Sequence, residues 1–319
     1  MHTRSRWPRS TGLRRRGVAE APAPSSVCRL CGGALRPAFT TTDRNRALSD
    51  VPFDYLRCAR CGTYSLASVP EDLGLYYPPE YYGPADRAAL EQVAASPAEQ
   101  AKLDLIRPHV AGGRLVEIGP GGGQFSLAAS HAGFAVSAIE MDAASCERLE
   151  RVVGVSAICS DHPETVLDEL GASDVIALWH VLEHLRDPAI VLERIAANLR
   201  TGGVLALAVP NPQSLQFRLL RGRWAHVDAP RHLFLVPLRA LVGFMASHGL
   251  ALAAATTCDP AGRHWNRFGW EYALRRPPAN RQAGLPRRVG AGVVTRLLWP
   301  LEGHGMVGST YTAVFVKRG

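Results

Sequence analysis

Four cysteines near the start of the chain form two pairs with a spacing typical of metal ligands. Cys28 and Cys31 make the first CxxC pair, and Cys58 and Cys61 make the second. A glycine follows the second cysteine of each pair, as a tight turn requires. Four thiolates in this pattern favour one tetrahedral ion, and zinc is the metal that such a closed site prefers. We therefore predict a small structural zinc ribbon held by these four residues.

A glycine-rich segment follows an apolar run and precedes a helical pattern, with the letters EIGPGGG at residues 117–123. Gly119, Gly121 and Gly123 alternate with other residues, so the chain can turn tightly and a ligand can lie against bare backbone. The spacing is ExGxGxG and not the GxGxxG of dinucleotide sites, because Gln124 stands where the last glycine would be. The loop by itself fits either a ligand cradle or a plain connection.

Two carboxylates stand at the ends of later apolar runs. Glu140 ends the second run, where its side chain can accept hydrogen bonds from both hydroxyls of a ribose, and Asp161 follows the third. The alternative for each is a surface carboxylate at a helix N-terminus, which the helix dipole favours. Together with the glycine loop, the pair favours a nucleoside site.

The segment HVLEH at residues 180–184 spells HxxEH, which elsewhere marks the metal-binding helix of a zinc protease. That motif needs a long amphipathic helix. Here it directly follows an apolar run, and the pair Asp187-Pro188 begins a new helix only a few residues later. The context therefore excludes the protease.

The elements that must position these residues alternate along the chain. Apolar runs that predict strands lie at residues 115–118, 135–139, 152–158, 175–179, 204–209, 250–256 and 311–316. Helical patterns lie between several of them, at residues 124–131, 144–151, 188–198 and 238–248. Regular alternation predicts an α/β fold with a doubly wound, mostly parallel sheet. Ligands of such sheets bind beyond the carboxyl ends of the strands, where the residues above stand.

Composition agrees with one large domain and one small module in 319 residues, 47% of them apolar. The formal charge of +8 comes mostly from arginines in two local clusters, so charge alone does not predict a nucleic-acid partner. No apolar run is long enough to span a bilayer, and none follows the N-terminal arginines as a secretory signal would require. Two CxxC pairs and three single cysteines suit a reducing compartment with a metal site better than a set of disulfides. We expect a cytoplasmic protein without a membrane partner.

Three segments follow from these patterns. Residues 1–26 are predicted to be a disordered basic tail, and residues 27–84 a zinc-ribbon module with a tyrosine-rich linker whose rings pack on a neighbour. Residues 85–319 are predicted to form the main domain.

The letters LVEIGPGGGQF, AIEMD, CSD and ALWHVLEHLRDP resemble the class I S-adenosylmethionine-dependent methyltransferases over about residues 103–250. The resemblance implies a seven-stranded Rossmann-like sheet whose last two strands are antiparallel, with residues 259–305 as a long, basic and mostly irregular insertion between them. It assigns Glu117, Gly119, Gly121 and Gly123 to the methionine part of S-adenosylmethionine, Glu140 to the ribose and Asp161 to the adenine. Similar bacterial methyltransferases also carry a cysteine ribbon followed by a YYPPEYY-like tract.

The resemblance also places the 180–184 segment beside the transferring methyl group, so His180 is a candidate for a cofactor contact, a substrate contact or a base. A smaller branch of the family binds a divalent metal in this segment. His180, Glu183 and His184, with the distant His232, have chemically adequate ligands for such an ion. The alternative, which we favour, is that Glu183 and His184 cap and orient the loop.

Residues 211–237 follow the fifth predicted strand and are expected to cover the substrate. His226 and His232 in this segment are further candidates for a base. Displacement at a sulfonium methyl depends more on alignment than on acid or base help, so the reaction does not require a base.

The sequence thus predicts methyl transfer from S-adenosylmethionine to an oxygen, nitrogen or carbon of a small molecule, such as a sugar nucleotide or a secondary metabolite. An NAD(P)-dependent oxidoreductase is a rival function, but the third fingerprint glycine is missing and no catalytic tyrosine-lysine pair is visible. A noncatalytic zinc-ribbon protein that binds nucleic acid is the other rival. The oligomeric state stays open.

Overall fold

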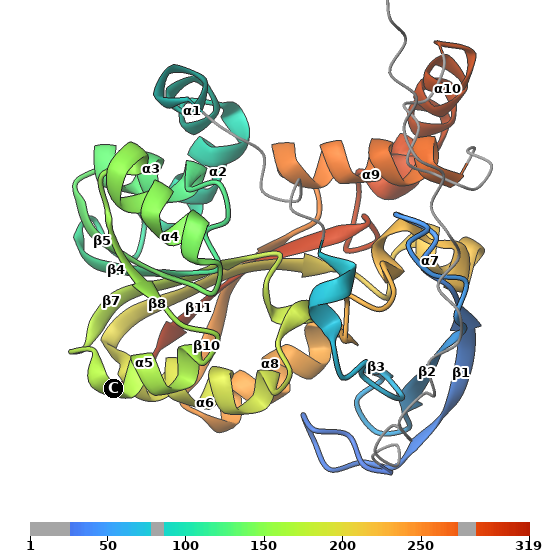
Figure 1. Cartoon of the computed structure of the whole chain (residues 1–319), viewed down its shortest axis with the longest axis horizontal. Helices are drawn as coiled ribbons and strands as arrows, with labels where there is room; N and C mark the ends of the chain where they lie inside the picture. Colours follow the sequence, from blue (N-terminus) through green and yellow to red (C-terminus); the bar gives the residue numbers. More distant parts are fainter. Residues whose placement is uncertain (1–25, 78–85, 274–284) are drawn as a thin grey trace, which may run out of the picture.

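The computed structural model describes residues 26–77, 86–273 and 285–319. Two sheets organise this part of the chain: a seven-stranded sheet flanked by helices, and a four-stranded sheet formed mainly by the N-terminal residues (Figure 1). The predicted tail at residues 1–26 lies outside the described residues except for Ser26, and so does most of the tyrosine-rich tract.

The large sheet has the strand order β10-β11-β8-β7-β4-β5-β6. Its strands are β4 (Gly113–Ile118), β5 (Phe134–Glu140), β6 (Ser156–Cys159), β7 (Ser173–Trp179), β8 (Leu199–Pro210), β10 (Leu250–Thr256) and β11 (Thr310–Lys317). The strands β4 to β8 pair in parallel, whereas β11 is antiparallel to both β8 and β10. The doubly wound, mostly parallel sheet and its antiparallel edge are confirmed.

The central strands are apolar on both faces because helices cover both. Val116 and Ile176 belong to one hydrophobic core, whereas their neighbours Leu115 and Val175 belong to the other. One face carries α1 (Arg87–Ala94), α2 (Pro97–Ile106), α3 (Gln124–His131) and α4 (Ala143–Arg148). The opposite face carries α5 (Pro163–Glu169), α6 (Pro188–Asn198) and α8 (Leu238–Ser247) (Figure 1).

Local sequence signals explain several helix boundaries. Asp187 accepts a hydrogen bond from the backbone of Ile190, and Pro188 then occupies the first turn of α6. Gly133 ends the turn after α3 with a φ of 91°. The helices predicted at residues 124–131 and 188–198 therefore have the predicted bounds.

One predicted strand was wrong in its first half. Residues 152 and 153 belong to a π-helical turn, η3 (Leu149–Val153), which continues α4, and β6 begins only at Ser156. Short apolar runs fit a buried helical turn as well as a strand, and here Leu149 and Val153 are buried against α3's side of the sheet.

The segment at residues 259–305 is not mostly irregular, which corrects the expectation from the resemblance. It forms α9 (Pro260–Ala273) and α10 (Leu285–Glu302). Trp265, Phe268 and Tyr272 follow one face of α9 at helical spacing and contact one another in sequence. This amphipathic pattern was present in the sequence.

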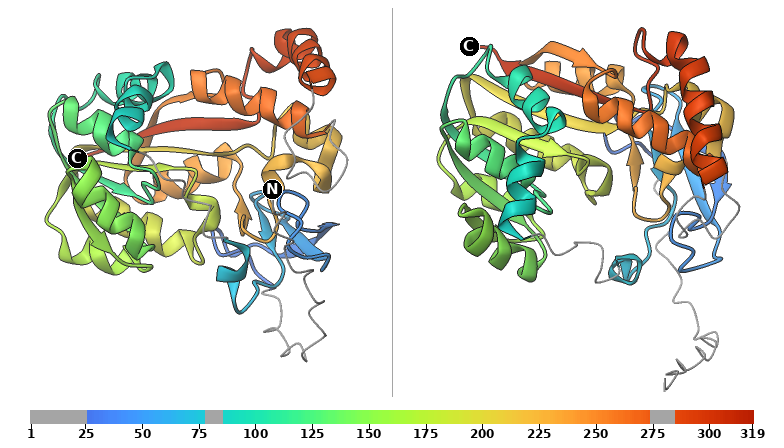
Figure 2. Two further views of the ribbon diagram at one scale, coloured as in Figure 1. Left: turned by 45° about the horizontal axis from the view of Figure 1, so that its top comes forward. Right: turned by 90° about the horizontal axis from the view of Figure 1, so that it is seen from above.

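The small sheet has the order β1-β2-β3-β9, and all its pairs are antiparallel. Its strands are β1 (Leu35–Thr41), β2 (Phe53–Cys58), β3 (Tyr64–Leu66) and β9 (Phe234–Leu235), and the 3-10 helix η1 (Leu73–Tyr76) follows β3. Because β9 comes from residues 211–237, this segment joins the N-terminal strands to the large domain (Figure 2).

Residues 211–237, which are expected to cover the substrate, form short helical turns and one strand. They contain α7 (Leu215–Leu220), the 3-10 turns η5 (Arg221–Arg223) and η6 (Ala225–Val227), and β9. Phe217 and Trp224 are buried in the core that also holds Tyr55 and Tyr64 of the N-terminal strands. These two aromatic residues therefore pack the segment against the N-terminal strands.

No helix in the described part of the chain is long and apolar enough to cross a membrane.

Candidate functional site

The carboxyl ends of β4, β5 and β7 bring the glycine loop, Glu140 and His180 to one edge of the large sheet. The three strands lie next to one another, and their register pairs Ile118 with Ile139 and with Leu178. The parallel register therefore brings together residues that are far apart in the sequence.

The glycine loop needs its glycines for two different reasons. Gly119, Gly121 and Gly123 all have a positive φ, between 54° and 80°, which favours glycine. A Cβ on Gly119 would lie 2.6 Å from Val181, and one on Gly123 would lie 2.7 Å from Val153. A Cβ on Gly121 would meet no described atom within 4 Å. Gly119 and Gly123 thus pack against protein, whereas Gly121 faces open space.

Glu117 is buried at the end of β4 and accepts a hydrogen bond of 2.5 Å from the hydroxyl of Ser126 on α3. Burial raises the pKa of this carboxyl to about 7, while the Ser126 hydroxyl opposes the rise. A ligand that brings a positive charge to the loop would stabilise the ionised form.

Glu140 is buried at the end of β5 and organises the backbone around it. One carboxylate oxygen accepts from the backbone nitrogens of Met141 and Asp142, at 2.8 and 3.1 Å. The other accepts from the backbone nitrogen of Gly121 at 3.2 Å. Glu140 therefore holds the glycine loop directly, which sequence reasoning did not predict. Asp161, by contrast, follows β6 and has an exposed side chain.

A cavity of about 220 Å³ opens beside the glycine loop. Its lining includes Glu117, Gly119, Lys102, Trp179, His180 and Trp265. A wider hollow of about 820 Å³ lies on β1 to β3 and is lined by arginines and aromatic rings, without a carboxylate or a histidine. The smaller cavity is the better candidate for the reaction because it lies at the carboxyl ends of the strands.

Several cavity residues were missed by sequence reasoning. Lys102 of α2 lies over the ring of Trp179 at 4.8 Å and pairs with Glu99 at 2.8 Å. Asp259 lies just before α9 and accepts a hydrogen bond of 2.5 Å from Thr312 of β11. Neither α2 nor α9 belongs to a recognisable motif, so only the amphipathic spacing within α9 could have pointed to this wall.

The predicted histidines divide into two groups. His180 lines the cavity with a φ of 60°, and its ring contacts Trp265 at 5.3 Å. His226 contacts the same tryptophan ring, also at 5.3 Å, but is not among the cavity's lining residues. Burial lowers the pKa of His180 to about 4 and that of His226 to about 3, so both are neutral at pH 7.

His232 lies apart from this cavity and packs against His184. The two rings are 4.6 Å apart and nearly perpendicular. Glu183, from the 3-10 turn η4 (Leu182–His184), is buried beside them. Of the four residues considered for a metal, Glu183, His184 and His232 come together. His180 is not part of this group, although its Nδ1 lies 3.4 Å from the carboxylate of Glu183.

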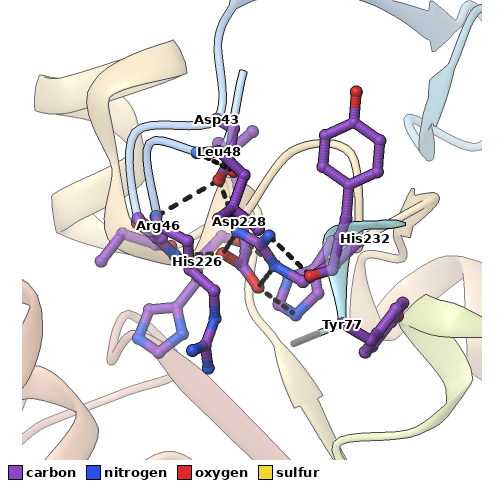
Figure 3. Close-up of polar contacts among 12 residues, drawn as sticks. Asp43, Arg46, Leu48, Tyr77, His226, Asp228 and His232 are labelled. Atoms are coloured by element: carbon purple, nitrogen blue, oxygen red, sulfur yellow. Dashed lines mark hydrogen bonds and ion pairs between the residues drawn. The ribbon is translucent and has the colours of Figure 1, made fainter. Parts of the chain in front are cut away.

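A buried ion-pair network that includes Asp43 and Asp228 lies beside His232 (Figure 3). Arg231 is fully buried and donates to Asp43 at 2.6 Å and to Asp228 at 2.7 Å. These contacts raise the pKa of Arg231, although burial opposes them. Asn45 donates to Asp228 as well. Residues of the N-terminal segment therefore hold the loop that carries His232.

The four predicted cysteine ligands also come together. Cys28 and Cys61 have Sγ atoms 3.7 Å apart, and the Sγ atoms of Cys31 and Cys58 are 3.5 Å apart. All four sulfurs lie within 4.8 Å of one another and none is in a disulfide. A tetrahedral zinc site with bonds of about 2.3 Å requires sulfurs about 3.8 Å apart, so the arrangement fits one ion.

The family described as "Methyltransferase domain" matches residues 90–255, which is more than half of the chain. The ubiquinone biosynthesis O-methyltransferase of Xanthomonas campestris pv. campestris (strain B100) is 30% identical over 125 residues, 37% of this chain and 52% of that protein. The enzyme of the same name from Colwellia psychrerythraea is 27% identical over 177 residues, 50% of this chain and 68% of that protein. The chain thus spans about half the length of the Xanthomonas relatives it matches.

Among solved structures, a phosphoethanolamine N-methyltransferase 2 of Haemonchus contortus in complex with S-adenosyl-L-methionine is 15% identical, with a TM-score of 0.48. That likeness covers 90% of this chain and 69% of the other. A SAM-dependent methyltransferase from Archaeoglobus fulgidus is 17% identical, with a TM-score of 0.46, and the likeness covers 71% of this chain and 97% of the other.

Proposed function

The chain belongs to the methyltransferase domain family as an S-adenosylmethionine-dependent methyltransferase, and we propose that its acceptor is a small molecule that enters the cavity beside His180. This family assignment favours methyl transfer over the two rival functions, an NAD(P)-dependent oxidoreductase and a noncatalytic zinc-ribbon protein that binds nucleic acid. S-adenosylmethionine supplies a methyl group on a positively charged sulfur. The protein's task is to bind that compound, to exclude water and to align the acceptor.

Glu140 is the residue that we assign to the ribose, and Gly121 and Glu117 are assigned to the methionine part. The main support is that the carboxylate of Glu140 is fixed by three backbone nitrogens beside a loop whose Gly121 opens onto free space. Gly119 and Gly123 support the loop. Asp161 is assigned to the adenine on the strength of the family resemblance alone.

His180 is assigned to the acceptor and to the methyl group of the cofactor. Its pKa of about 4 makes it neutral at pH 7, so it can accept a hydrogen bond, but it is a weak base. His226 stands behind Trp265, and its still lower pKa makes it a weaker base. The reaction therefore relies on alignment, and His180 positions the acceptor.

Oxygen is the acceptor atom with the best support among oxygen, nitrogen and carbon. The curated relatives named above are O-methyltransferases, although they match only part of the chain. A hydroxyl of a sugar nucleotide or a secondary metabolite remains the class of acceptor that we propose.

Residues 27–84 form, in this proposal, a zinc-bearing module that supports residues 85–319, the methyltransferase domain. The fit of four sulfurs to one tetrahedral ion supports zinc. The zinc stabilises the fold here, because four protein ligands leave no open position.

The proposal is tested by titration calorimetry with S-adenosylhomocysteine. We expect Glu140→Ala to weaken binding roughly tenfold to a hundredfold, because it removes a charged acceptor and frees the glycine loop. Glu169→Ala, at an exposed position of α5, is the matched control and should bind as the wild type does. Wild-type affinity in Glu140→Ala would refute the assignment.

A further inference from the structure

The wider hollow of about 820 Å³ on β1 to β3 takes no part in the proposed function. Its lining includes Arg36 of β1, Arg57 of β2 and Arg221 of η5, together with the rings of Phe39 and Tyr64. This hollow and the cavity beside the glycine loop share no lining residue. The hollow is therefore a second candidate site, and what it binds can be inferred without the proposed function.

Two of these arginines stand directly opposite each other on neighbouring strands. The antiparallel register pairs Arg36 with Arg57, and it pairs Arg57 with Tyr64. Residues in such a pair lie on the same face of the sheet, where two like charges repel and destabilise the pairing. Arg36, Arg57 and Arg221 are all exposed, and none of them forms an ion pair with a carboxylate in the part of the chain that the structure describes. Their repulsion thus has no compensation within the described protein.

The third arginine occupies a strained backbone position. Arg221 has a φ of 50° and a ψ of −127°, which is the conformation of the first central residue in a type II′ turn. Glycine is preferred at that position because a Cβ is disfavoured there. The hydroxyl of Thr41 donates to the carbonyl of Gly222 at 2.6 Å and holds this turn against β1. The turn therefore keeps a cation beside the two strand arginines at a position where glycine would be less strained.

Aromatic rings support two of the three guanidinium groups. The guanidinium carbon of Arg57 lies 5.8 Å from the ring centre of Tyr64, and that of Arg221 lies 5.6 Å from the ring centre of Phe217. The two rings contact each other at 5.1 Å, so they form one support. A guanidinium group over a ring keeps its N–H donors available to an anion. Holding the groups in place also lowers the entropy cost of binding.

Phosphate is the anion that this arrangement fits best. The planar guanidinium fork donates two parallel hydrogen bonds to a phosphate group, and several arginines can share its oxygens. Three cations around one hollow favour two linked phosphates over one. The volume of the hollow lies in the range of small-molecule sites, about 300 to 1,000 Å³, and Pro37, Ala38 and Phe39 offer apolar surface to an organic part of the ligand.

We propose that the hollow on β1 to β3 binds the diphosphate group of a nucleotide-sized ligand through Arg36, Arg57 and Arg221. The ligand compensates the repulsion between the two strand arginines. A single-stranded nucleic acid is the competing ligand, but it is bound in a groove that follows several successive phosphates. The three arginines instead surround one hollow, which favours a compact ligand.

Titration calorimetry of the full chain, equilibrated with zinc, tests the proposal with UDP as the probe. UDP lacks adenine, which the proposed S-adenosylmethionine site would recognise. We expect UDP to bind, and UMP to bind roughly tenfold more weakly because it lacks the second phosphate. Arg36→Gln and Arg57→Gln should each weaken UDP binding by roughly tenfold, because each removes charged donors to the diphosphate.

The matched control is Arg223→Gln, at an exposed arginine of the same turn that does not line the hollow. It removes the same charge and should bind UDP as the wild type does. Thermal unfolding separates lost binding from lost structure. Arg36→Gln removes one of two opposed cations, so without ligand it should melt at or above the temperature of the wild type.

A wild type that does not bind UDP, or that binds UMP equally well, would overturn the proposal. Unchanged affinity in Arg36→Gln and Arg57→Gln would place UDP elsewhere and overturn it as well. The same loss in Arg223→Gln would show a general attraction of charges and no site. A thymidine oligonucleotide that binds more tightly than UDP and depends on the same arginines would identify nucleic acid as the ligand instead.

Titration with S-adenosylhomocysteine on the same samples keeps the two proposals apart. Its affinity should be unchanged in all three variants, because the hollow and the cavity share no residue. A protein that binds S-adenosylhomocysteine but not UDP would contradict the diphosphate site and leave the proposed function standing. A protein that binds UDP through these arginines but not S-adenosylhomocysteine would do the reverse.

Discussion

Glu117 and Glu140 are buried carboxylates at the ends of neighbouring strands, but their surroundings differ. Glu140 accepts three backbone hydrogen bonds, whereas Glu117 accepts one from the hydroxyl of Ser126. Desolvation therefore dominates at Glu117 and raises its pKa to about 7. The two residues look alike in the sequence, and only their hydrogen-bond partners separate them.

The raised pKa of Glu117 predicts a pH dependence of stability in the free protein. The unfolded chain loses this proton near pH 4.5 and the folded chain near pH 7, so wild-type stability falls between those values. Relative to Glu117→Gln, we expect the wild type to lose about 3 kcal/mol of unfolding free energy between about pH 4 and about pH 8. Urea unfolding of both proteins at the two pH values measures this loss. A difference that does not change with pH would contradict the prediction.

Gly121 offers a second test at the scale of one residue, with Gly133 as a matched control. Both have a positive φ, and a Cβ at either position would meet no described atom within 4 Å. Alanine should therefore destabilise both to a similar extent, about 1 kcal/mol or more. Only Gly121→Ala should also lose affinity for S-adenosylhomocysteine, because its methyl group enters the space beside the loop. Calorimetry that found equal affinities in the two variants would show that the loop does not contact the ligand.

At the scale of elements, the segment between the last two strands supplies α9, which completes the cavity wall, and α10, which contacts α9. α9 carries Trp265 into the cavity wall, and α10 ends at Glu302, which is fully buried. Glu302 accepts from the indole nitrogen of Trp270 at 3.0 Å and from the amide of Gln216 at 3.2 Å. This one side chain therefore connects α10 with α9 and α7.

Replacing Glu302 should weaken that connection. Glu302→Ala leaves the buried indole donor of Trp270 without its acceptor, whereas the amide of Gln216 keeps the carbonyl of Asn266 at 2.7 Å. We expect a loss of about 1 to 3 kcal/mol in unfolding free energy. Glu193→Ala on α6 removes a half-exposed carboxylate and is expected to change stability by less than about 0.5 kcal/mol. Urea unfolding of both variants measures the effect. Equal stability in the two would mean that the α9 and α10 pair does not depend on this contact.

At the scale of the whole molecule, the N-terminal strands and the large domain share a hydrophobic core. Tyr55 is fully buried and donates its hydroxyl to the carbonyl of His232 at 2.6 Å. β3 pairs with β9, and Asp43 forms a buried ion pair with Arg231. The module is therefore built into the domain, and the loop carrying His232 depends on it.

Zinc removal should consequently affect the entire protein. We expect a chelator, or Cys58→Ser, to lower the melting temperature by roughly 10 °C or more in one cooperative transition. Differential scanning calorimetry measures it, and added zinc should restore the chelated sample. Two separate transitions, with the larger one unchanged, would contradict this coupling.

The sequence by itself determined the large sheet and the position of its loop. Strand and helix periodicity, the glycine spacing and the two cysteine pairs are patterns within short segments. Such patterns can be recognised in the sequence without knowledge of the fold. Helices such as Gln124–His131 and Pro188–Asn198 follow from such signals. The strand predicted from residue 152 was wrong before Ser156, because a buried helical turn has the same apolar composition as a strand.

Only the tertiary structure decided what surrounds each side chain. Glu183, His184 and His232 converge because β9 pairs with an N-terminal strand, and α9 reaches the cavity because β11 returns beside β8. Burial, unmet hydrogen bonds and pKa shifts arise from neighbours that are distant in the chain. No pattern within a short segment records those neighbours, so the sequence could propose the residues of a site but not their partners.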